Sequence, residues 1–309
     1  MNKKRIKDFI LHHYFTRELF FILGQRKINK KRIDKILQKE NFKLSTIIND
    51  NLIVSLTSYG KRIAELKYTL YSLIIQTIRP YKIIVNLSYE DKNLLNCELL
   101  FFEKYGIEFN FCENLRSFKK LIPTMEQYTD KVIITVDDDM FYDRNLVELL
   151  WKTHIKYPNS IIAHNIYEIT YSNNTIHTYD LWKHSIVTKK TTYKNFFVGC
   201  GGVLYPPNSL FQDYNNRILY EKLTPIADDI WFYFMAYLKN TKIIQPDKPI
   251  LKFHYVNPYR EYGIEEGNTL TKENVGLKKN DEQFHNVLKY YGITEQDFIN
   301  KINIEYKEF

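Results

Sequence analysis

The chain has 309 residues, 44% hydrophobic and 26% charged, so it can bury a substantial core and does not have the composition of a disordered protein. Its net charge of +8 is concentrated, because residues 1–50 hold 13 of the 44 basic and 5 of the 36 acidic residues. The other 259 residues therefore carry 31 of each sign, which argues against a nucleic-acid-binding surface.

Residues 1–50 are expected to form a basic helical arm. Helices are predicted over 3–23 and 27–40, with Gly24 as a stop between them. Two placements stay open: packing on the domain, or a peripheral contact of residues 1–45 with an anionic membrane surface. No secretory signal follows the first lysines, and no apolar run reaches the ~18 residues of a spanning helix. We therefore expect a cytoplasmic protein, with or without contact to the inner face of the membrane.

From Asn51 onward, strands and helices alternate in units of about thirty residues. The predicted elements are a strand over 52–57, a helix with apolar residues from 63 to 74, a strand over 82–87, a helix over 93–105 that Gly106 ends, a strand over 107–111, a short helix within 114–123, a strand over 132–136, a helix over 144–156 and a strand over 160–164. This order predicts an α/β fold with a mostly parallel central sheet flanked by helices and right-handed crossovers.

Three consecutive carboxylates, Asp137, Asp138 and Asp139, follow the strand predicted over 132–136. That strand is a continuous β-branched run and is expected to be buried on both faces. Adjacent acids repel one another and raise each other's pKa unless a cation neutralises them, as a divalent metal with oxygen ligands does. Because ligands bind at this edge of open α/β sheets, we predict a cation site here rather than a solvated acidic turn.

The alternation stops over residues 166–195, where a β-hairpin insertion is predicted with its turn at Asn173 and Asn174. A Gly-rich segment with Gly201 and Gly202 follows. Asp228 and Asp229 then open a helix whose residues 231, 234, 235 and 238 form one apolar face. Acids are favoured in the first turn of a helix by its dipole.

This order of parts resembles the GT-A fold nucleotide-sugar glycosyltransferases. The resemblance rests on the first strand with its turn at Thr57 to Arg62, the Asp-x-Asp at a later strand end, Gly-Gly-Val-Leu-Tyr-Pro-Pro from 201 and Ala-Asp-Asp-Ile-Trp from 227. It is most similar to bacterial family-2-like transferases that build capsule or lipopolysaccharide glycans, and it covers about residues 51–290. It implies a catalytic domain over 51–309, with a nucleotide-binding part at about 51–165 and an acceptor-binding part at about 166–309.

The resemblance implies that a nucleoside-diphosphate sugar binds across the carboxyl ends of the strands. A diphosphate leaving group gains negative charge as the anomeric bond breaks, and a metal held by Asp137 and Asp139 could neutralise it. Asp139 is expected to bind Mn²⁺ or Mg²⁺ directly and Asp137 to reach the ribose or the metal, with Asp138 also at the donor. His254, in a predicted strand over 251–255, is a further candidate metal ligand, or a structural histidine.

The acceptor hydroxyl must lose its proton to a base as the anomeric centre becomes oxocarbenium-like. In inverting members of the resembling group the base falls in the acidic pair before the helix. This maps to Asp229 as the base and Asp228 as an acceptor contact. The alternative, that the two acids cap the helix, is compatible with the same sequence.

Softer candidates lie at the nucleotide. Thr57, Ser58, Tyr59 and Arg62 occupy the first strand and turn, where the resembling fold meets the nucleotide. Basic side chains near phosphate are useful, so Arg116, Lys119 and Lys120 are candidate diphosphate contacts or members of a solvated face. Gly201 and Gly202 would let the backbone approach the donor sugar, or mark a bulge.

The sequence therefore predicts a metal-dependent glycosyltransferase of the hexosyltransferase type, acting on a glycan or lipid-linked glycan acceptor. One rival is a sugar-nucleotide nucleotidyltransferase, although Ser58 to Arg62 lacks the Gly-rich phosphate loop expected of that class. A second is a non-catalytic carbohydrate-binding protein. The odd set of Cys97, Cys112 and Cys200 lacks metal-ligand spacing and fits a reducing compartment.

Overall fold

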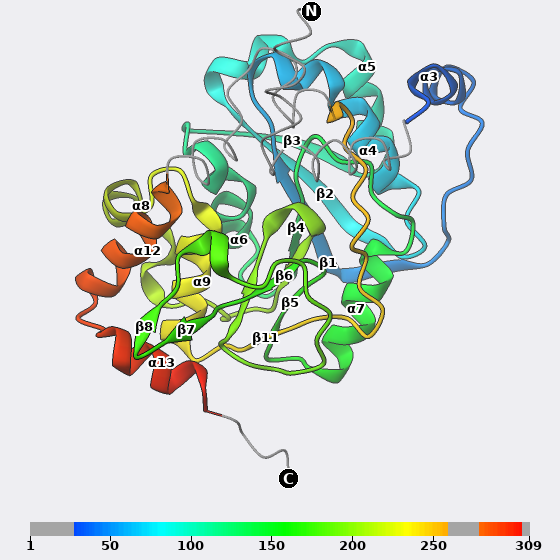
Figure 1. The fold of residues 1–309 in the computed structure, drawn as a ribbon. Coiled ribbons are helices and arrows are strands. Elements are labelled where there is room, and N and C mark those ends of the chain that lie inside the picture. The colour runs from blue at the N-terminus through cyan, green and yellow to red at the C-terminus, as the bar shows by residue number, and fades with distance from the viewer. Residues whose placement is uncertain (1–27, 259–277, 305–309) are drawn as a thin grey trace, which may run out of the picture.

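Runs of β-branched and aliphatic residues form a central sheet, as the sequence predicts. A computed structural model describes residues 28–258 and 278–304, and in them seven strands line up in the order β11-β5-β10-β4-β1-β2-β3 (Figure 1). The strands are β1 (Ile48–Thr57), β2 (Arg79–Ser88), β3 (Ile107–Cys112), β4 (Val132–Thr135), β5 (Ile161–Ala163), β10 (Val203–Tyr205) and β11 (Ile243–Ile244).

All neighbouring strands of this sheet are parallel except at β10, which runs antiparallel to both β4 and β5. Val203, at the start of β10, pairs with Thr135, at the end of β4. The reversed strand therefore brings the Gly-rich segment before Val203 to the edge where the three aspartates begin. The predicted mostly parallel α/β class is confirmed, and this reversal positions the candidate site.

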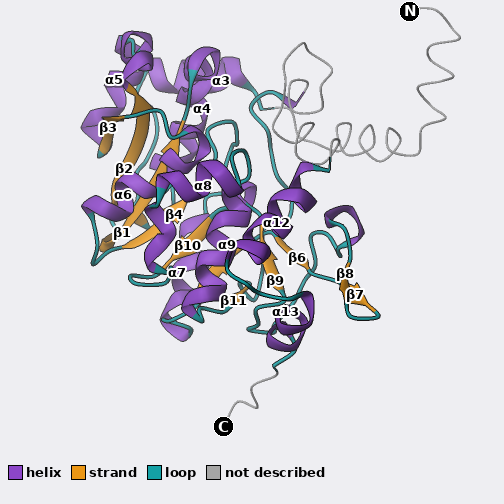
Figure 2. Ribbon diagram, turned by 90° about the vertical axis from the view of Figure 1, so that its left-hand side faces the viewer, coloured by secondary structure: helices purple, strands orange, loops and turns teal. Residues whose placement is uncertain are grey.

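Helices cover both faces of the sheet (Figure 2). The helices are α3 (Lys30–Gln38), α4 (Leu66–Ile74), α5 (Cys97–Leu100), α6 (Ile122–Gln127), α7 (Leu146–Lys156), α8 (Arg217–Leu223), α9 (Asp228–Lys239), α12 (Lys279–Tyr290) and α13 (Glu295–Ile302). The 3₁₀ turns are η1 (Gly60–Glu65), η2 (Tyr89–Leu94), η3 (Phe101–Tyr105), η4 (Arg116–Lys120), η5 (Tyr179–Leu181), η6 (Gly199–Gly201) and η7 (Gln212–Asn215).

The core is divided by the sheet. One cluster of buried side chains joins the sheet to α4 and α7, and the other joins it to α6, α8, α9, α12 and α13. Along β4, Ile133 belongs to the second cluster and Ile134 to the first, and both are at most 1% exposed. Strand β4 is thus buried on both faces, as its unbroken β-branched run predicts.

The predicted hairpin is confirmed as β7 (Tyr171–Ser172) and β8 (Thr175–Ile176), an antiparallel pair. Its turn residues Asn173 and Asn174 have φ values of 47° and 60°, the left-handed geometry that Asn tolerates in tight hairpins. A second small sheet pairs β6 (Ile166–Glu168) with β9 (Asn195–Phe197). The Ile176 amide donates to Glu295 at 2.6 Å, which ties the hairpin to α13.

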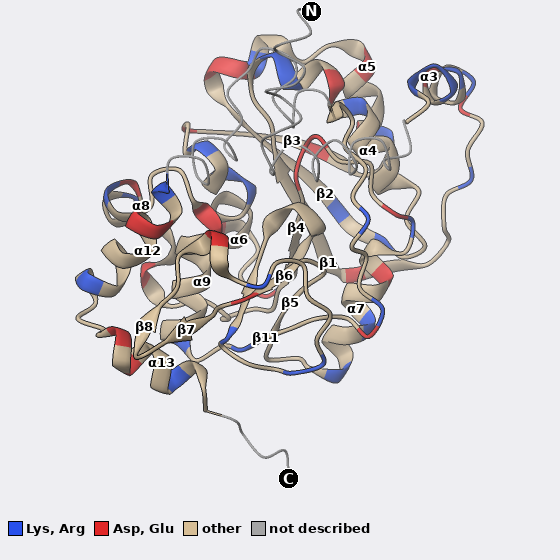
Figure 3. Cartoon of the chain, viewed as in Figure 1, with Lys and Arg blue, Asp and Glu red and all other residues tan. Residues whose placement is uncertain are grey.

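The second predicted helix of the basic arm is α3, and it packs on the domain. Ile33 is 6% exposed, Lys30 pairs with Glu65, and Lys67 lies 3.1 Å from Asp34. Lys and Arg residues occupy much of this helix (Figure 3). The helix predicted over 3–23 lies outside the described residues. In the parts of the chain that the structure describes, no helix is long and apolar enough to cross a membrane.

Two predicted elements differ most from the structure. The helix predicted over 93–105 is divided into η2, α5 and η3, because the Asn96 side chain accepts from the Leu99 amide at 3.1 Å and starts a new helix. Gly106 does end it, with φ 88°. The strand predicted over 251–255 is wrong: this segment makes a bridge between Tyr255 and Met140, a residue of the acidic loop that follows β4 with Asp137, Asp138 and Asp139.

Candidate active site

The first half of the site forms where parallel strands β1 and β4 end at the same edge. The Val136 amide donates to the Ser55 carbonyl at 3.1 Å, so the chain stays paired up to the first aspartate. Ser58 follows β1 and Asp137 follows Val136, which places the first turn and the three aspartates together, as the sequence predicts.

Asp138 has the least exposed side chain of the three aspartates. Its side chain is 8% exposed, it accepts from the Ser58 hydroxyl, and its other oxygen lies 2.8 Å from the Arg62 guanidinium. Its carbonyl accepts from the Thr69 hydroxyl of α4 at 2.6 Å. Asp138 therefore fixes Arg62 and the start of the acidic loop.

Arg62 supplies a cation to the acidic strand end. It pairs with both Asp138 and Asp139, and the Tyr59 ring lies 5.6 Å from its guanidinium carbon. Burial alone would lower the pKa of Arg62, but the two carboxylates outweigh it and raise that pKa. The repulsion between the adjacent aspartates, which the sequence predicts, is thus relieved by the Arg62 guanidinium.

Asp139 is joined to the segment that carries His254. The Val256 amide donates to the Asp139 carbonyl at 2.6 Å, and the Phe141 amide donates to the His254 carbonyl at 2.7 Å. The structure therefore places the backbone of His254 beside the acidic loop, although the two are far apart in the sequence.

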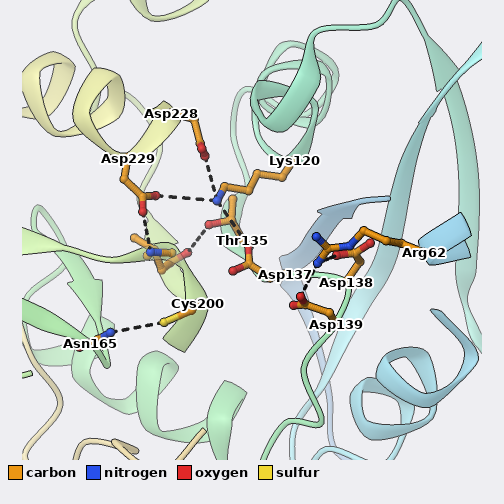
Figure 4. A network of polar contacts seen from close by, with 12 residues as sticks. Arg62, Lys120, Thr135, Asp137, Asp138, Asp139, Asn165, Cys200, Asp228 and Asp229 are labelled. Carbon is orange, nitrogen blue, oxygen red and sulfur yellow. Dashed lines mark hydrogen bonds and ion pairs between the residues drawn. The ribbon is translucent and has the colours of Figure 1, made fainter. Parts of the chain in front are cut away.

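The second half of the site reaches the first through Lys120. Its ammonium lies 2.8 Å from Asp228, 3.7 Å from Asp229 and 3.5 Å from Asp137 (Figure 4). Asp228 and Asp229 occupy the first turn of α9. The two acidic motifs, about ninety residues apart in sequence, thus meet at one buried lysine.

Asp229 is held by the Gly-rich segment rather than by its own helix. The N-cap of α9 is Ala227 with no side-chain cap, and one Asp229 oxygen accepts from the Gly199 amide at 3.0 Å. Burial raises the pKa of Asp229 to about 7, with Asp228 and Asp137 adding to the rise and Lys120 opposing it. A carboxyl group with this pKa can exchange a proton near neutral pH.

Gly199, which the sequence does not single out, lies directly against the lysine and the acid pair. A Cβ on it would lie 2.7 Å from the Lys120 nitrogen and 3.0 Å from an Asp229 oxygen. A Cβ on Gly201 would meet Asn165 and Phe253 at 3.1 Å, and Gly202 has φ 86°. Repeated glycine before a strand was the available signal, but sequence does not show which glycine faces the acids.

The remaining candidates have these contacts. The Thr57 hydroxyl donates to the Asn86 carbonyl at 2.7 Å, and Arg116 donates to the Pro225 carbonyl at 3.1 Å. Lys119 is 2% exposed and donates to the Ser88 hydroxyl at 2.6 Å. Burial lowers the pKa of Lys119. A role of Thr57, Arg116 or Lys119 at a nucleotide stays a prediction.

The acidic loop fits a metal only if a ligand completes the coordination. Among the described residues, no cluster of three His, Cys, Asp or Glu side chains could hold a metal ion by itself. Mg²⁺ is usually bound by one or two carboxylates together with substrate phosphates. Asp137 retains 31% of its side-chain exposure and so has an oxygen available for a cation shared with a diphosphate, whereas the Asp139 carboxylate is 10% exposed and paired with Arg62.

We expect D229N to stabilise the protein, relative to wild type, more at pH 8 than at pH 5. Because the pKa of Asp229 is raised from 3.8 to about 7, folding takes up a proton between these values and wild-type stability falls as pH rises through this window. One pKa unit is about 1.4 kcal/mol. Since 26% of this side chain is exposed, we expect a difference of only about 1–2 kcal/mol. Urea unfolding at both pH values measures it, and an equal effect at both would contradict it.

Comparisons with known proteins give no match to a family model and no match to a curated protein. Similar solved structures include S. aureus TarS 1-349, with 12% identity and a TM-score of 0.45 over 84% of this chain and 76% of that one. TarS 1-349 in complex with UDP has 12% identity and a TM-score of 0.43 over 69% and 63%. The 4-diphosphocytidyl-2C-methyl-D-erythritol synthase from Anaerococcus prevotii DSM 20548 has 12% identity and a TM-score of 0.40 over 65% and 90%. Such distant likenesses assign no function, which has to be argued from the site.

Proposed function

We propose that this chain is a glycosyltransferase of GT-A type that moves a sugar from a nucleoside-diphosphate sugar to a hydroxyl of a glycan acceptor, with inversion. The observation that carries the proposal is the meeting of Asp137 with Asp228 and Asp229 around Lys120. A transferase needs a place for an anionic leaving group and a base for the acceptor, and this arrangement offers both within one small region.

The donor half comprises the first turn and the acidic loop. Asp137 and Asp139 would hold Mn²⁺ or Mg²⁺, which when bound would neutralise charge on the diphosphate. Arg62 holds Asp138 and Asp139 in place through its ion pairs, and the exposed Tyr59 ring offers a surface for a base. Gly201 and Gly202 leave room for the donor sugar in this proposal.

The base half is Asp229. The acceptor oxygen attacks the anomeric carbon, and the bond from that carbon to the phosphate oxygen breaks with its electron pair leaving on the nucleoside diphosphate. The hydroxyl proton passes to the Asp229 carboxylate. Its raised pKa favours this step, since a base with a pKa near the working pH takes up a proton most effectively. Asp228 would contact the acceptor.

The acceptor is proposed to be a surface glycan or a lipid-linked glycan, of the kind found in capsule or lipopolysaccharide, bound by the part from about 166 to 309. Such an acceptor would be made at the inner face of the cell membrane, where the basic arm of residues 1–45 could bind anionic lipid. The division into an arm over 1–50 and a catalytic domain over 51–309 belongs to the same proposal.

The proposal is tested by thermal unfolding with a panel of nucleoside-diphosphate sugars, each with and without Mn²⁺. A ligand at one hundred times its Kd stabilises the folded state by about 2.7 kcal/mol, which corresponds to a rise of several degrees in Tm. We expect donors with one particular nucleobase to give such a rise, and only with Mn²⁺ present. The protein should then transfer the sugar from that donor or hydrolyse the donor. The absence of stabilisation by any donor would favour a carbohydrate-binding protein. Release of pyrophosphate from a nucleoside triphosphate and a sugar phosphate would favour a nucleotidyltransferase.

A further inference from the structure

Lys120 lies where the two halves of the site meet. Its side chain is 8% exposed and its ammonium is within 4 Å of three carboxylates, closest to Asp228. A charged group this buried is normally tied to its partners, and here the partners come from both halves of the site.

The turn that carries Lys120 is fixed to the helices behind the acid pair. Phe118, 1% exposed in η4, stacks on Tyr220 of α8 with ring centroids 4.1 Å apart and contacts Phe232 of α9 at 5.8 Å. Because Asp228 and Asp229 begin α9, this aromatic contact holds the turn of the lysine against the helix of the acids. The position of Lys120 is thus built into the core and does not depend on a flexible surface side chain.

The Gly-rich segment completes the enclosure. The Gly199 amide donates to Asp229, and a Cβ at Gly199 would lie 2.7 Å from the Lys120 nitrogen. Real Cβ atoms essentially never make contacts this short, so a larger residue shifts the ammonium or the Asp229 carboxylate. The same glycine both binds the proposed base and makes room for its counter-ion.

We propose that Lys120 is a positioning residue, which holds the Asp229 carboxylate in place and ties the acid pair of α9 to Asp137 of the donor half. Gly199 is required because it leaves space for this contact. The proposal rests on the proposed function, in that it assigns the task of Lys120 relative to the base Asp229. It differs from the diphosphate contact expected from the sequence, since the ammonium is directed at protein carboxylates.

The charged and titratable groups around Asp229 decide at which pH its carboxyl group ionises, and so how the rate of transfer depends on pH. Lys120 faces it from η4, Asp228 from α9 and Asp137 from the end of β4, and the phenols of Tyr205 on β10 and Tyr179 on η5 also interact with it. Of these five, Lys120 alone is a cation. Its removal therefore makes ionisation of Asp229 less favourable and moves the acid limb of the rate profile to higher pH.

The test compares K120M, K120R and G199A with wild type in kcat, KM for the donor and the pH profile of kcat. We expect K120M to lower kcat at least tenfold, to change KM less than threefold and to move the acid limb up by about one pH unit. K120R keeps the charge and should leave the limb close to wild type, while G199A should resemble K120M. The matched control K82M removes a lysine paired with Glu108 at 2.7 Å outside the site and should change none of these. An unmoved acid limb in K120M would overturn the proposal.

A second measurement separates this proposal from the proposed function. K120M should lower Tm more at pH 8 than at pH 5, because unpaired buried carboxylates are left ionised, and adding D228N and D229N should restore most of the loss. If wild type uses no donor but this coupling is found, the proposed function fails while Lys120 still holds the acids together. If the loss in K120M is independent of pH and of the two aspartates, the positioning role is wrong whatever the function.

Discussion

D229N should bind the donor as wild type does and transfer its sugar ~10²–10⁴ times more slowly. The substitution keeps the size of the side chain. It also keeps an oxygen that can accept from the Gly199 amide, which in the wild-type structure lies 3.0 Å from the Asp229 carboxylate. What is lost is the ability to accept a proton from the acceptor. Because the donor is proposed to bind at Asp137 and Asp139, its affinity should not depend on Asp229.

Rates of transfer and donor binding by calorimetry measure the two effects separately. Wild type should show an acid limb with a midpoint near pH 7, because Asp229 acts only when ionised and its pKa is raised to about 7. D229N should show no such limb. D247N, which removes an exposed carboxylate paired with Lys156, serves as a control and should match wild type. Transfer by D229N within threefold of wild type would remove Asp229 as the base.

The sheet was predictable because its signals are local. Five consecutive residues from Val132 to Val136 are β-branched, and a strand with no polar face has to be covered on both sides. The reversal of β10 has no such signal, because a run of three buried residues does not show whether the strand is parallel or antiparallel to its neighbours. The interruption after η2 was missed because the cap at Asn96 depends on a single side chain, which the helical periodicity of residues 93–105 outweighed.

The types of residue in the site were predictable, but their partners were not. Charge repulsion among three adjacent aspartates shows that a cation is needed, and the sequence predicts a metal ion for that task. Arg62, which lies 77 residues before Asp139, supplies one cation in the structure. The sequence predicts Lys120 as a diphosphate contact or a member of a solvated face, whereas in the structure it pairs with Asp228, on a turn that Phe118 packs against Tyr220. Long-range packing of this kind leaves no periodic trace in a sequence.

D139N should abolish the stabilisation of the protein by donor and Mn²⁺ together and lower transfer by ~10²-fold or more. The fold should be retained, since Arg62 keeps Asp138 at 2.8 Å and the hydrogen bond from the Val256 amide to the Asp139 carbonyl uses the backbone. Thermal unfolding with the best donor measures the first effect and initial rates the second. D143N, an exposed carboxylate four residues further along the same loop, is the matched control and should behave as wild type.

Chelation provides the complementary arm of this test. Wild type in EDTA should lose donor-dependent stabilisation and transfer, and excess Mn²⁺ should restore both. The residual transfer of D139N should be the same with and without EDTA, because the carboxylate expected to bind the cation is absent. If that residual activity still falls in EDTA, Asp137 keeps the cation without Asp139. If wild type is unaffected by EDTA, the positive charge at the leaving group has to come from Arg62 or another basic side chain, and the metal has no part in the reaction.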